Sequence, residues 1–130
     1  MTRLFAQNTK IAVSQTINEV GAIIARYGGD RFQHMVDNLR NLGIFQFEYA
    51  GFLISYNFPL GSDQQERQRI YRAAAQCVKF RLEEVASGIR SPAVVFFAHI
   101  IANPSAPPGE QETMFDKAKT LLPAPVIRKP

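Results

Sequence analysis

The sequence predicts an α+β fold in which an antiparallel β-hairpin or small sheet packs against three to four helices. Two patterns lead to this prediction: residues 44–58 alternate between apolar and polar side chains, whereas residues 16–28 and 63–89 repeat apolar side chains at helical spacing. Of the 130 residues, 46% are hydrophobic and 20% are charged, which suffices for one buried core. We expect a single globular domain at residues 1–122 and a flexible, basic, proline-rich tail at residues 123–130.

The beginning of the chain predicts an extended segment followed by a helix. Residues 1–13 alternate loosely and suit a strand or an extended arm. Thr16 and Glu19 have the spacing of a capping box, which predicts that the helix begins there. Gly28-Gly29 ends the helix as a C-cap, and a phosphate-binding loop is disfavoured because such a loop precedes a helix. The buried stripe of this helix is formed by Ile17, Val20, Ile23 and Ile24.

The clearest strand pattern follows residues 32–42, which themselves fit a short helix. Residues 44–50 and 52–58 alternate as two strands, and Ala50-Gly51 between them suits a tight hairpin turn. The apolar and aromatic side chains of the two strands share one face of the hairpin. This face could stack single-stranded bases, but we expect it to pack against the helices as the core, because so large an exposed apolar surface is unusual. The face is formed by Phe45, Phe47, Tyr49, Phe52, Ile54, Tyr56 and Phe58.

The long helix of residues 63–89 is predicted from its two ends and its apolar stripe. Asp63 and Glu66 form a second capping box, and Gly88 closes the helix, with Ile89 folding back as the hydrophobic contact beyond the cap. Phe80 lies off the stripe, where packing under a neighbouring element is favoured over a role as an exposed contact residue. The stripe consists of Ile70, Ala74, Cys77, Val78, Leu82, Val85 and Ile89.

Shorter elements are expected toward the end of the chain. Ser91-Pro92 is typical of an N-cap followed by proline at the first helical position. It opens a short, mostly buried helix at residues 93–102, and a buried strand is the alternative because the segment is rich in β-branched residues. Residues 103–109 hold three prolines and form a loop. Residues 110–122 predict a surface helix with an inner face of Met114, Phe115, Ala118, Leu121 and Leu122.

The sequence contains no motif typical of catalysis or metal binding. Only His34 and His99 could act as imidazole bases, and we expect His34 to be exposed and His99 to be a hydrogen-bonded core histidine. Cys77 falls on the apolar stripe and is expected to be a small buried hydrophobe. One cysteine with two distant histidines does not match a zinc site. We therefore expect a non-enzymatic protein with no catalytic residue, no metal and no cofactor.

Composition also predicts where the protein resides. The longest uncharged apolar run, near residues 93–102, has about half the length that a bilayer span requires. Residues 1–20 lack the basic start and apolar core of a signal peptide. The single cysteine permits no internal disulfide and suits a reducing compartment. These observations predict a cytoplasmic protein without a membrane partner, and they are compatible with a homo-oligomer.

The net charge of +4 lies entirely in residues 64–130, because residues 1–63 carry equal numbers of acidic and basic side chains. Such asymmetry favours an anionic partner, either nucleic acid or a nucleotide. The predicted anion-binding residues all lie on the long helix and are Arg67, Arg69, Arg72, Lys79 and Arg81.

Helical geometry divides this basic set. At 100° per residue, Arg72 and Lys79 face outward, whereas Arg67 and Arg81 project toward the apolar stripe. The alternative to anion binding is a solvated helix face with a Lys79–Glu83 pair, together with buried ion pairs for Arg67 and Arg81.

The long helix also carries a longer pattern, approximately W-R-A-L-x-L-V-I-K-A-K-L-E-A-V-x-A-G-I, which corresponds to residues 71–89. The matching positions are Arg72, Ala73, Lys79, Leu82, Glu83, Val85, Gly88 and Ile89, with Arg81 in place of a lysine. Two flanking pieces match as well: Thr16, Glu19, Val20, Arg26, Tyr27 and Gly28, and then Phe97-Ala98-His99-Ile100. On these residues the chain resembles a family of small uncharacterised proteins encoded in bacteriophage and prophage genomes. It departs from the pattern in Tyr71, where tryptophan is usual, and in Gln76, where an apolar residue is usual.

The resemblance implies a phage accessory protein that acts in the cytoplasm of the infected bacterial host, and it implies no catalytic residue. Genes of such proteins often lie among replication and recombination genes. Together with the basic helix, this predicts a non-enzymatic accessory protein that binds nucleic acid or a nucleotide. The alternative is a phage-encoded inhibitor that binds a host enzyme or an anti-phage defence system, and a third possibility is a structural role inside a phage complex.

Overall fold

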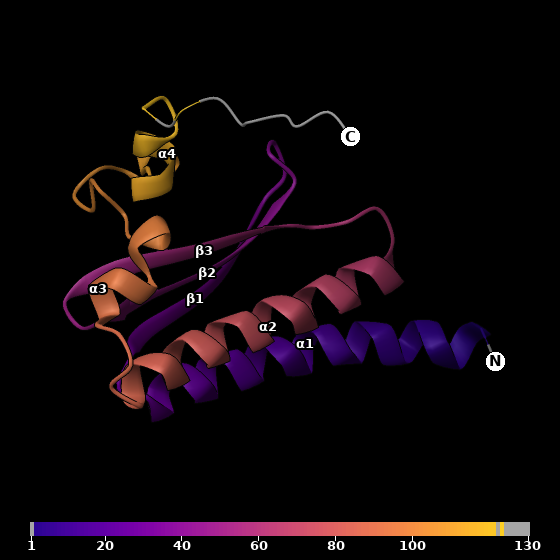
Figure 1. Ribbon diagram of the computed structural model, residues 1–130. Coiled ribbons are helices and arrows are strands. Elements are labelled where there is room, and N and C mark those ends of the chain that lie inside the picture. Colours follow the sequence, from indigo (N-terminus) through magenta and orange to yellow (C-terminus); the bar gives the residue numbers. More distant parts are fainter. Residues whose placement is uncertain (1, 122, 124–130) are drawn as a thin grey trace, which may run out of the picture.

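The computed structural model confirms the predicted α+β class: a three-stranded antiparallel sheet packs against two main helices and several short ones (Figure 1). The structure describes the backbone of residues 2–121 and 123, and the side chains of residues 13–121 and 123. The elements in chain order are α1 (Thr2–Arg26), β1 (Asp30–Asp37), β2 (Leu42–Tyr49), β3 (Phe52–Pro59), α2 (Gln64–Ala86), α3 (Pro92–Val95), the 3₁₀ turns η1 (Phe97–His99) and η2 (Pro108–Glu110), and α4 (Met114–Ala118).

The sheet is a meander in the order β1-β2-β3. The predicted hairpin is confirmed: Tyr49 pairs with Phe52, and Ala50 and Gly51 between them take positive φ angles of 54° and 84°, as a type I′ turn requires. The short helix predicted at residues 32–42 is wrong, because that stretch supplies β1 and the turn into β2. Pairing with β2 stabilises the strand more than the weak helical preference of so short a segment stabilises a helix.

The core lies between the sheet and the helix pair α1–α2, which run side by side along one face (Figure 1). Because the hairpin face that was predicted to be core faces these helices, it is not available as a stacking platform. Phe45, Phe47 and Ile54 are completely buried there, and Phe45 contacts the rings of Phe58 and Tyr71. The largest fully buried side chains are Tyr71, Phe45, Phe47, Phe96, Ile24, Ile54, Leu82, Val20 and Val78.

Helix α1 begins earlier than the sequence predicts. It runs from Thr2, so Thr16 is a buried residue in its interior and not an N-cap, and residues 1–13 do not form a separate extended arm where they are described. A capping-box spacing marks a helix start only if the preceding backbone leaves the helical conformation. The predicted end is confirmed: Gly28 has φ 92°, and the amides of Gly28 and Gly29 donate to the carbonyls of Ala25 and Ile24.

Helix α2 begins and ends where the sequence predicts, but the hydrogen bonds at its N-terminus differ from those of a capping box. The Asp63 carboxylate accepts from the Glu66 amide at 2.8 Å, but the Glu66 carboxylate bonds Ser62 and not the Asp63 amide. At the other end, the Ile89 amide donates to the Glu84 carbonyl at 3.2 Å, which completes a Schellman motif around Gly88. The Ile89 side chain is 68% exposed, so any contact that it makes with the helix covers only a minor part of it.

The segment of residues 93–102 forms neither predicted alternative in full: its helix α3 has only four residues, none of them buried, and the chain after it makes isolated β-bridges and not a strand. Ser91 caps α3 as expected, with its hydroxyl accepting from the Val94 amide. After α3 and η1 the chain becomes extended, and Ile100 pairs with Ile54 at the edge of β3. The Ile101 amide donates to the Leu53 carbonyl at 2.8 Å, so this strip covers part of the free edge of β3.

The helix predicted at residues 110–122 is shorter than expected. Helix α4 spans only Met114–Ala118 and lies on the side of the sheet opposite α1 and α2 (Figure 1). Phe115 and Leu121 are exposed, so they do not form the predicted inner face. Leu122 and residues 124–130, which include most of the predicted tail, lie outside the described residues.

Gly43→Ala is expected to destabilise the fold by about 1–3 kcal/mol. A Cβ at this position of β2 would lie 2.5 Å from Cε2 and 2.7 Å from Cζ of the buried Phe58 ring, which is held by neighbouring rings. Urea unfolding followed by circular dichroism measures the change. Gly109→Ala is the matched control, because its Cβ would meet no atom within 4 Å. Equal stability of the two variants would contradict the packing described for Phe58.

Candidate functional site

The five basic residues predicted to bind anions occupy different positions around α2. Arg69 and Arg72 are exposed, and Lys79 forms the predicted pair with Glu83, with 3.9 Å between Nζ and Oε1. Arg81 is half-buried, as expected from its position beside the stripe. Arg67 is exposed, which corrects the prediction that it projects toward the core. The first turns of α2 extend beyond the sheet, so this part of the helix is less covered (Figure 1).

The predicted alternative of buried ion pairs for Arg67 and Arg81 is wrong. Within the described part of the chain, neither side chain forms an ion pair, and the same holds for Arg69 and Arg72. Four of the five predicted residues therefore form no salt bridge in the described structure, although the charge of Arg69 helps to lower the pKa of Glu66 and Arg72 lines a hollow with Glu19. A positive charge that the fold leaves uncompensated is available to an anionic partner.

The solvent side of α2 also presents an aromatic side chain. Arg69, Arg72, Lys79 and Phe80 fall within an arc of roughly 100° that faces away from the buried stripe. Phe80 is 59% exposed, so the prediction that it packs under a neighbouring element is wrong. Its position off the apolar stripe was the signal that marked it as a surface residue. We call these four residues the outer face of α2.

Arg81 lies on another flank of α2, next to β3 and η1. Its guanidinium carbon is 5.5 Å from the centre of the Tyr56 ring, and Nη1 donates to the Cys77 carbonyl at 3.3 Å. His99 contacts the same Tyr56 ring, with 4.7 Å between ring centres. Cys77 is only partly buried, so it is not the fully enclosed hydrophobe that was expected. Packing against Tyr56 holds the Arg81 side chain in a defined position.

Burial perturbs both titratable rings beside Arg81. Burial, together with a hydrogen bond to the Cys77 thiol, raises the pKa of Tyr56 to about 12 despite the opposing charge of Arg81. Burial and the charge of Arg81 lower the pKa of His99 to about 4. Both rings are therefore neutral at pH 7, and Arg81 is the charged member of this cluster. No hydrogen bond joins the His99 ring to another described residue, in contrast to the prediction.

His34 occupies a structural position. Its Nε2 lies 2.7 Å from the Tyr71 hydroxyl, so the half-buried His34 ring and the buried Tyr71 side chain form a hydrogen bond across the β1–α2 interface. Burial lowers the pKa of His34, which favours the neutral ring. The prediction that His34 is simply exposed is therefore wrong. This contact explains how Tyr71, which was missed as a core residue, can be buried with its hydroxyl.

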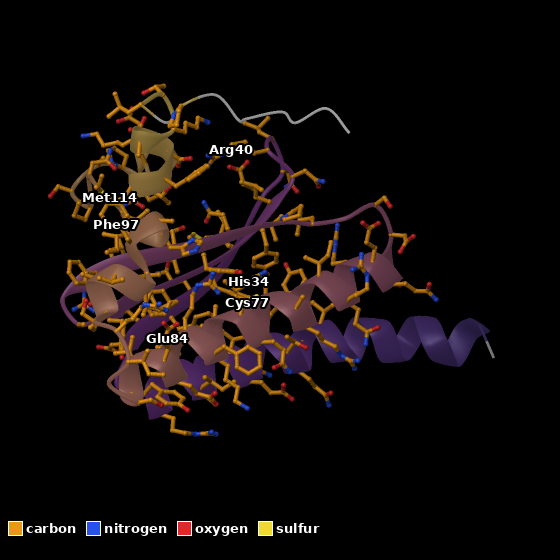
Figure 2. The ribbon with its side chains drawn as sticks, viewed as in Figure 1. His34, Arg40, Cys77, Glu84, Phe97 and Met114 are labelled. Carbon is orange, nitrogen blue, oxygen red and sulfur yellow. The ribbon has the colours of Figure 1, made fainter. Side chains whose placement is uncertain are left out.

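A hollow of about 430 Å³ lies between the end of α2 and α3. Arg90, which follows α2, donates from Nη1 to Oε2 of Glu84 at 2.6 Å. Glu84 lies near the end of α2 that adjoins α3, whereas Cys77 lies further back along the same helix (Figure 2). The hollow is lined by Phe80, Arg81, Glu84, Arg90, Val94 and Val95. Arg90 was not among the predicted anion-binding residues, because it follows the helix and lines a hollow that also requires residues of α3.

A second hollow on the opposite side of the sheet contains residue types that catalytic triads use. Ser55, His99 and Asp116 all line it, and its volume is about 370 Å³. However, the Ser55 hydroxyl donates to Oδ1 of Asn57 at 2.7 Å, and the Asp116 carboxylate accepts from the Thr113 amide at 3.2 Å. Since neither group bonds His99 in the described structure, this hollow lacks the relay that nucleophilic catalysis requires.

The candidate site is thus a basic helix surface with an exposed ring, adjoining a hollow that contains two arginines. In the described ranges, no three His, Cys, Asp or Glu side chains gather closely enough to hold a metal. No helix of the described chain is long and apolar enough to cross a membrane. Comparisons of this chain with models of protein families, with curated proteins and with solved structures found no match.

Proposed function

We propose that this protein binds single-stranded nucleic acid along the outer face of α2. In this proposal Arg69, Arg72 and Lys79 contact phosphates, and a base stacks on Phe80. The observation that supports it is the exposure of Phe80 on the same side of the helix as Arg69 and Arg72, two exposed arginines that form no salt bridge in the described structure. Cations that follow the backbone and a ring that stacks a base are the two components of sequence-tolerant single-strand binding.

The exposed ring favours a single strand over a duplex. In a duplex the base faces are covered by their neighbours, so Phe80 would gain little there, whereas an unpaired base offers its π-face to any aromatic side chain. The phosphate contacts alone would serve either form. Lys79 contributes less than the two arginines, because Glu83 lies 3.9 Å away and competes for its charge.

A second candidate function is inhibition of a host enzyme or defence protein by direct contact. It is favoured by exposed apolar side chains at the junction of α2 and α3, where Ile89 and Val94 are more than half exposed. Such residues typically mark a protein-binding surface when they are contiguous. The resemblance to phage accessory proteins is compatible with either function, and it would place both in the cytoplasm of an infected bacterium.

Replacing both outer arginines is expected to weaken binding to a labelled single strand in a salt-dependent way. Each phosphate contact contributes about 0.7 to the slope of log affinity against log salt, so Arg69→Gln/Arg72→Gln should lower the slope by about 1.4. Phe80→Ala should weaken binding about fivefold or more without changing the slope, because stacking is not ionic. Fluorescence anisotropy measures both effects at about 25 to 200 mM salt, where the affinity from phosphate contacts depends strongly on the salt concentration.

The matched control is Lys117→Gln/Lys119→Gln, which removes the same charge from two exposed positions at α4. If the effect depends on the outer face of α2, this control should retain the slope of the unmodified protein. An equal loss in both double variants would show a general charge effect and would contradict the assigned surface. Absence of binding to any strand at low salt would exclude the proposed function and leave protein binding as the candidate to test.

A further inference from the structure

The hollow between α2 and α3 combines the groups that recognise a phosphorylated nucleoside. Its lining includes two arginines, Arg81 and Arg90, and a single acidic residue, Glu84. Its remaining lining is apolar and includes the exposed Phe80 ring. The net charge of the lining is therefore +1, which favours an anion. The hollow has a volume of about 430 Å³ and is widely open to solvent, so a ligand bound there would keep part of its surface exposed.

Arg81 is held in place before any ligand arrives. The Tyr56 ring lies against its guanidinium, and the Cys77 carbonyl accepts one of its five N–H groups. The remaining donors have no described partner. A positioned guanidinium loses little conformational freedom when it binds an oxyanion, and its planar fork matches the oxygens of a phosphate.

Arg90 differs from Arg81 because its charge is already engaged. The bond of 2.6 Å between Nη1 and the Glu84 carboxylate neutralises it in the absence of a ligand. A phosphate monoester carries close to two negative charges at neutral pH, and it can therefore compete with Glu84 for this guanidinium. A phosphodiester inside a continuous strand carries only one charge and offers two free oxygens, so it matches this pair of arginines less well.

We propose that this hollow binds a nucleoside phosphate monoester, with the phosphate on Arg81 and Arg90 and the base against Phe80. The inference rests on the proposed function: the outer face of α2 would bind the phosphates inside a strand, and the adjoining hollow would bind a phosphate at the end of the strand. Such a unit exists both as a free mononucleotide and as the phosphorylated end of a single strand. The two sources share the same chemistry, and separate arms of the experiment distinguish them.

The experiment measures binding of the whole chain to three ligands by isothermal titration: adenosine 5′-monophosphate, and one short oligonucleotide with either a 5′-phosphate or a 5′-hydroxyl end. We expect the 5′-phosphate to strengthen binding of the oligonucleotide about fivefold or more, as a charge-assisted contact does. Arg81→Gln should abolish this difference, whereas Lys117→Gln, which removes one positive charge elsewhere, should preserve it. If the free nucleotide binds as tightly as the phosphorylated strand, the site is one for mononucleotides; weaker binding assigns it to strand ends.

A second variant separates ligand binding from a structural role of Arg81. Glu84→Gln removes the carboxylate that competes for Arg90, so it should strengthen binding of the 5′-phosphorylated strand about threefold or more. A merely structural role predicts no such gain. Thermal unfolding of each variant shows whether it is folded at the temperature of titration, and Lys117→Gln is the control for loss of one positive charge elsewhere.

The two proposals can fail separately. Equal affinities for phosphorylated and hydroxyl-ended strands, with no binding of the mononucleotide, would overturn the terminal-phosphate site while leaving the outer face of α2 intact. Binding of the mononucleotide that Arg81→Gln abolishes, without binding of the hydroxyl-ended strand, would support the hollow and exclude the proposed function. If Glu84→Gln weakens phosphate binding, the assigned competition for Arg90 is wrong and the proposal is overturned.

Discussion

Phe45→Ala is expected to lower the free energy of unfolding by about 3–5 kcal/mol, the largest effect of any single substitution considered for this protein. The Phe45 side chain is 0% exposed and lies at the centre of the ring cluster on β2. It contacts Phe32 and Phe58 in the sheet and Tyr71 of α2. Truncation removes the transfer free energy of the ring and also leaves a cavity that its rigid aromatic neighbours cannot fill.

Urea unfolding monitored by circular dichroism measures this loss, and a parallel thermal scan should show a midpoint lower by about 10–20 °C. Because the loss is a large share of the total stability of a small domain, Phe45→Leu provides a milder variant with a cost of about 1–2 kcal/mol. Leu39→Ala is the control: this side chain is 99% exposed, and its removal should change stability by no more than about 0.5 kcal/mol. A small effect at Phe45 would contradict its place in the core.

Stability is expected to fall as the pH is lowered from 6.5 to 4, because His99 resists protonation in the folded state. Burial and Arg81 lower its pKa from 6.5 to about 4. Within this window the unfolded chain binds the proton more readily than the folded one, so the free energy of unfolding decreases with decreasing pH. The full stabilisation is present above pH 6.5. Because the His99 ring is partly exposed, we expect the free energy of unfolding to fall by about 2 kcal/mol across this window.

Urea unfolding at pH 7.5, 5.5 and 4.2 measures this dependence, and His99→Gln should flatten it, because glutamine does not titrate. The flattening should be incomplete, since burial lowers the pKa of His34 as well and gives a contribution of the same sign. Asp37 and Glu66 also have lowered pKa values, caused first by side-chain hydrogen bonds from Arg40 and Ser62. Asp37 loses its contribution as the pH falls below 3.8, and Glu66 as it falls below 4.5, so only Glu66 overlaps the acidic end of the His99 window. An unchanged slope in His99→Gln would refute the assignment.

Local patterns predicted those features whose partners are close in sequence. The N-caps at Asp63 and Ser91 and the C-cap glycine Gly28 are confirmed, because each cap depends on hydrogen bonds to residues within one turn of helix. The hairpin at Ala50-Gly51 is confirmed for the same reason: two residues with positive φ determine how the flanking strands pair.

The same patterns failed where another element decides the outcome. Thr16 and Glu19 have capping-box spacing, yet α1 continues through them, since a stretch that lies against α2 gains stability from packing beyond its intrinsic preference. Residues 32–42 fit a short helix but supply the greater part of β1 and the turn into β2, because β2 offers β1 a partner strand. Tyr71 could enter the core because His34, 37 residues earlier, bonds its hydroxyl.

The candidate site was predicted only in part. The concentration of positive charge on the long helix is a property of composition, and the outward direction of Arg72 follows from helix geometry alone. Whether Arg67 is covered depends on how far the sheet extends beneath α2, and whether Phe80 is covered depends on its neighbours. Neither can be inferred from the helix itself.

By itself the sequence determined the α+β class, the β2–β3 hairpin, the C-terminal end of α1, the N-caps of α2 and α3, and the excess of positive charge in residues 64–130. These properties depend on the composition of the chain and on hydrogen bonds between residues that are near neighbours along it. Only the tertiary structure decided which cations remain unpaired, and that Arg81 and Arg90 line one hollow with Phe80. Burial and charge pairing depend on distances between elements that are separate in sequence, and packing sets those distances.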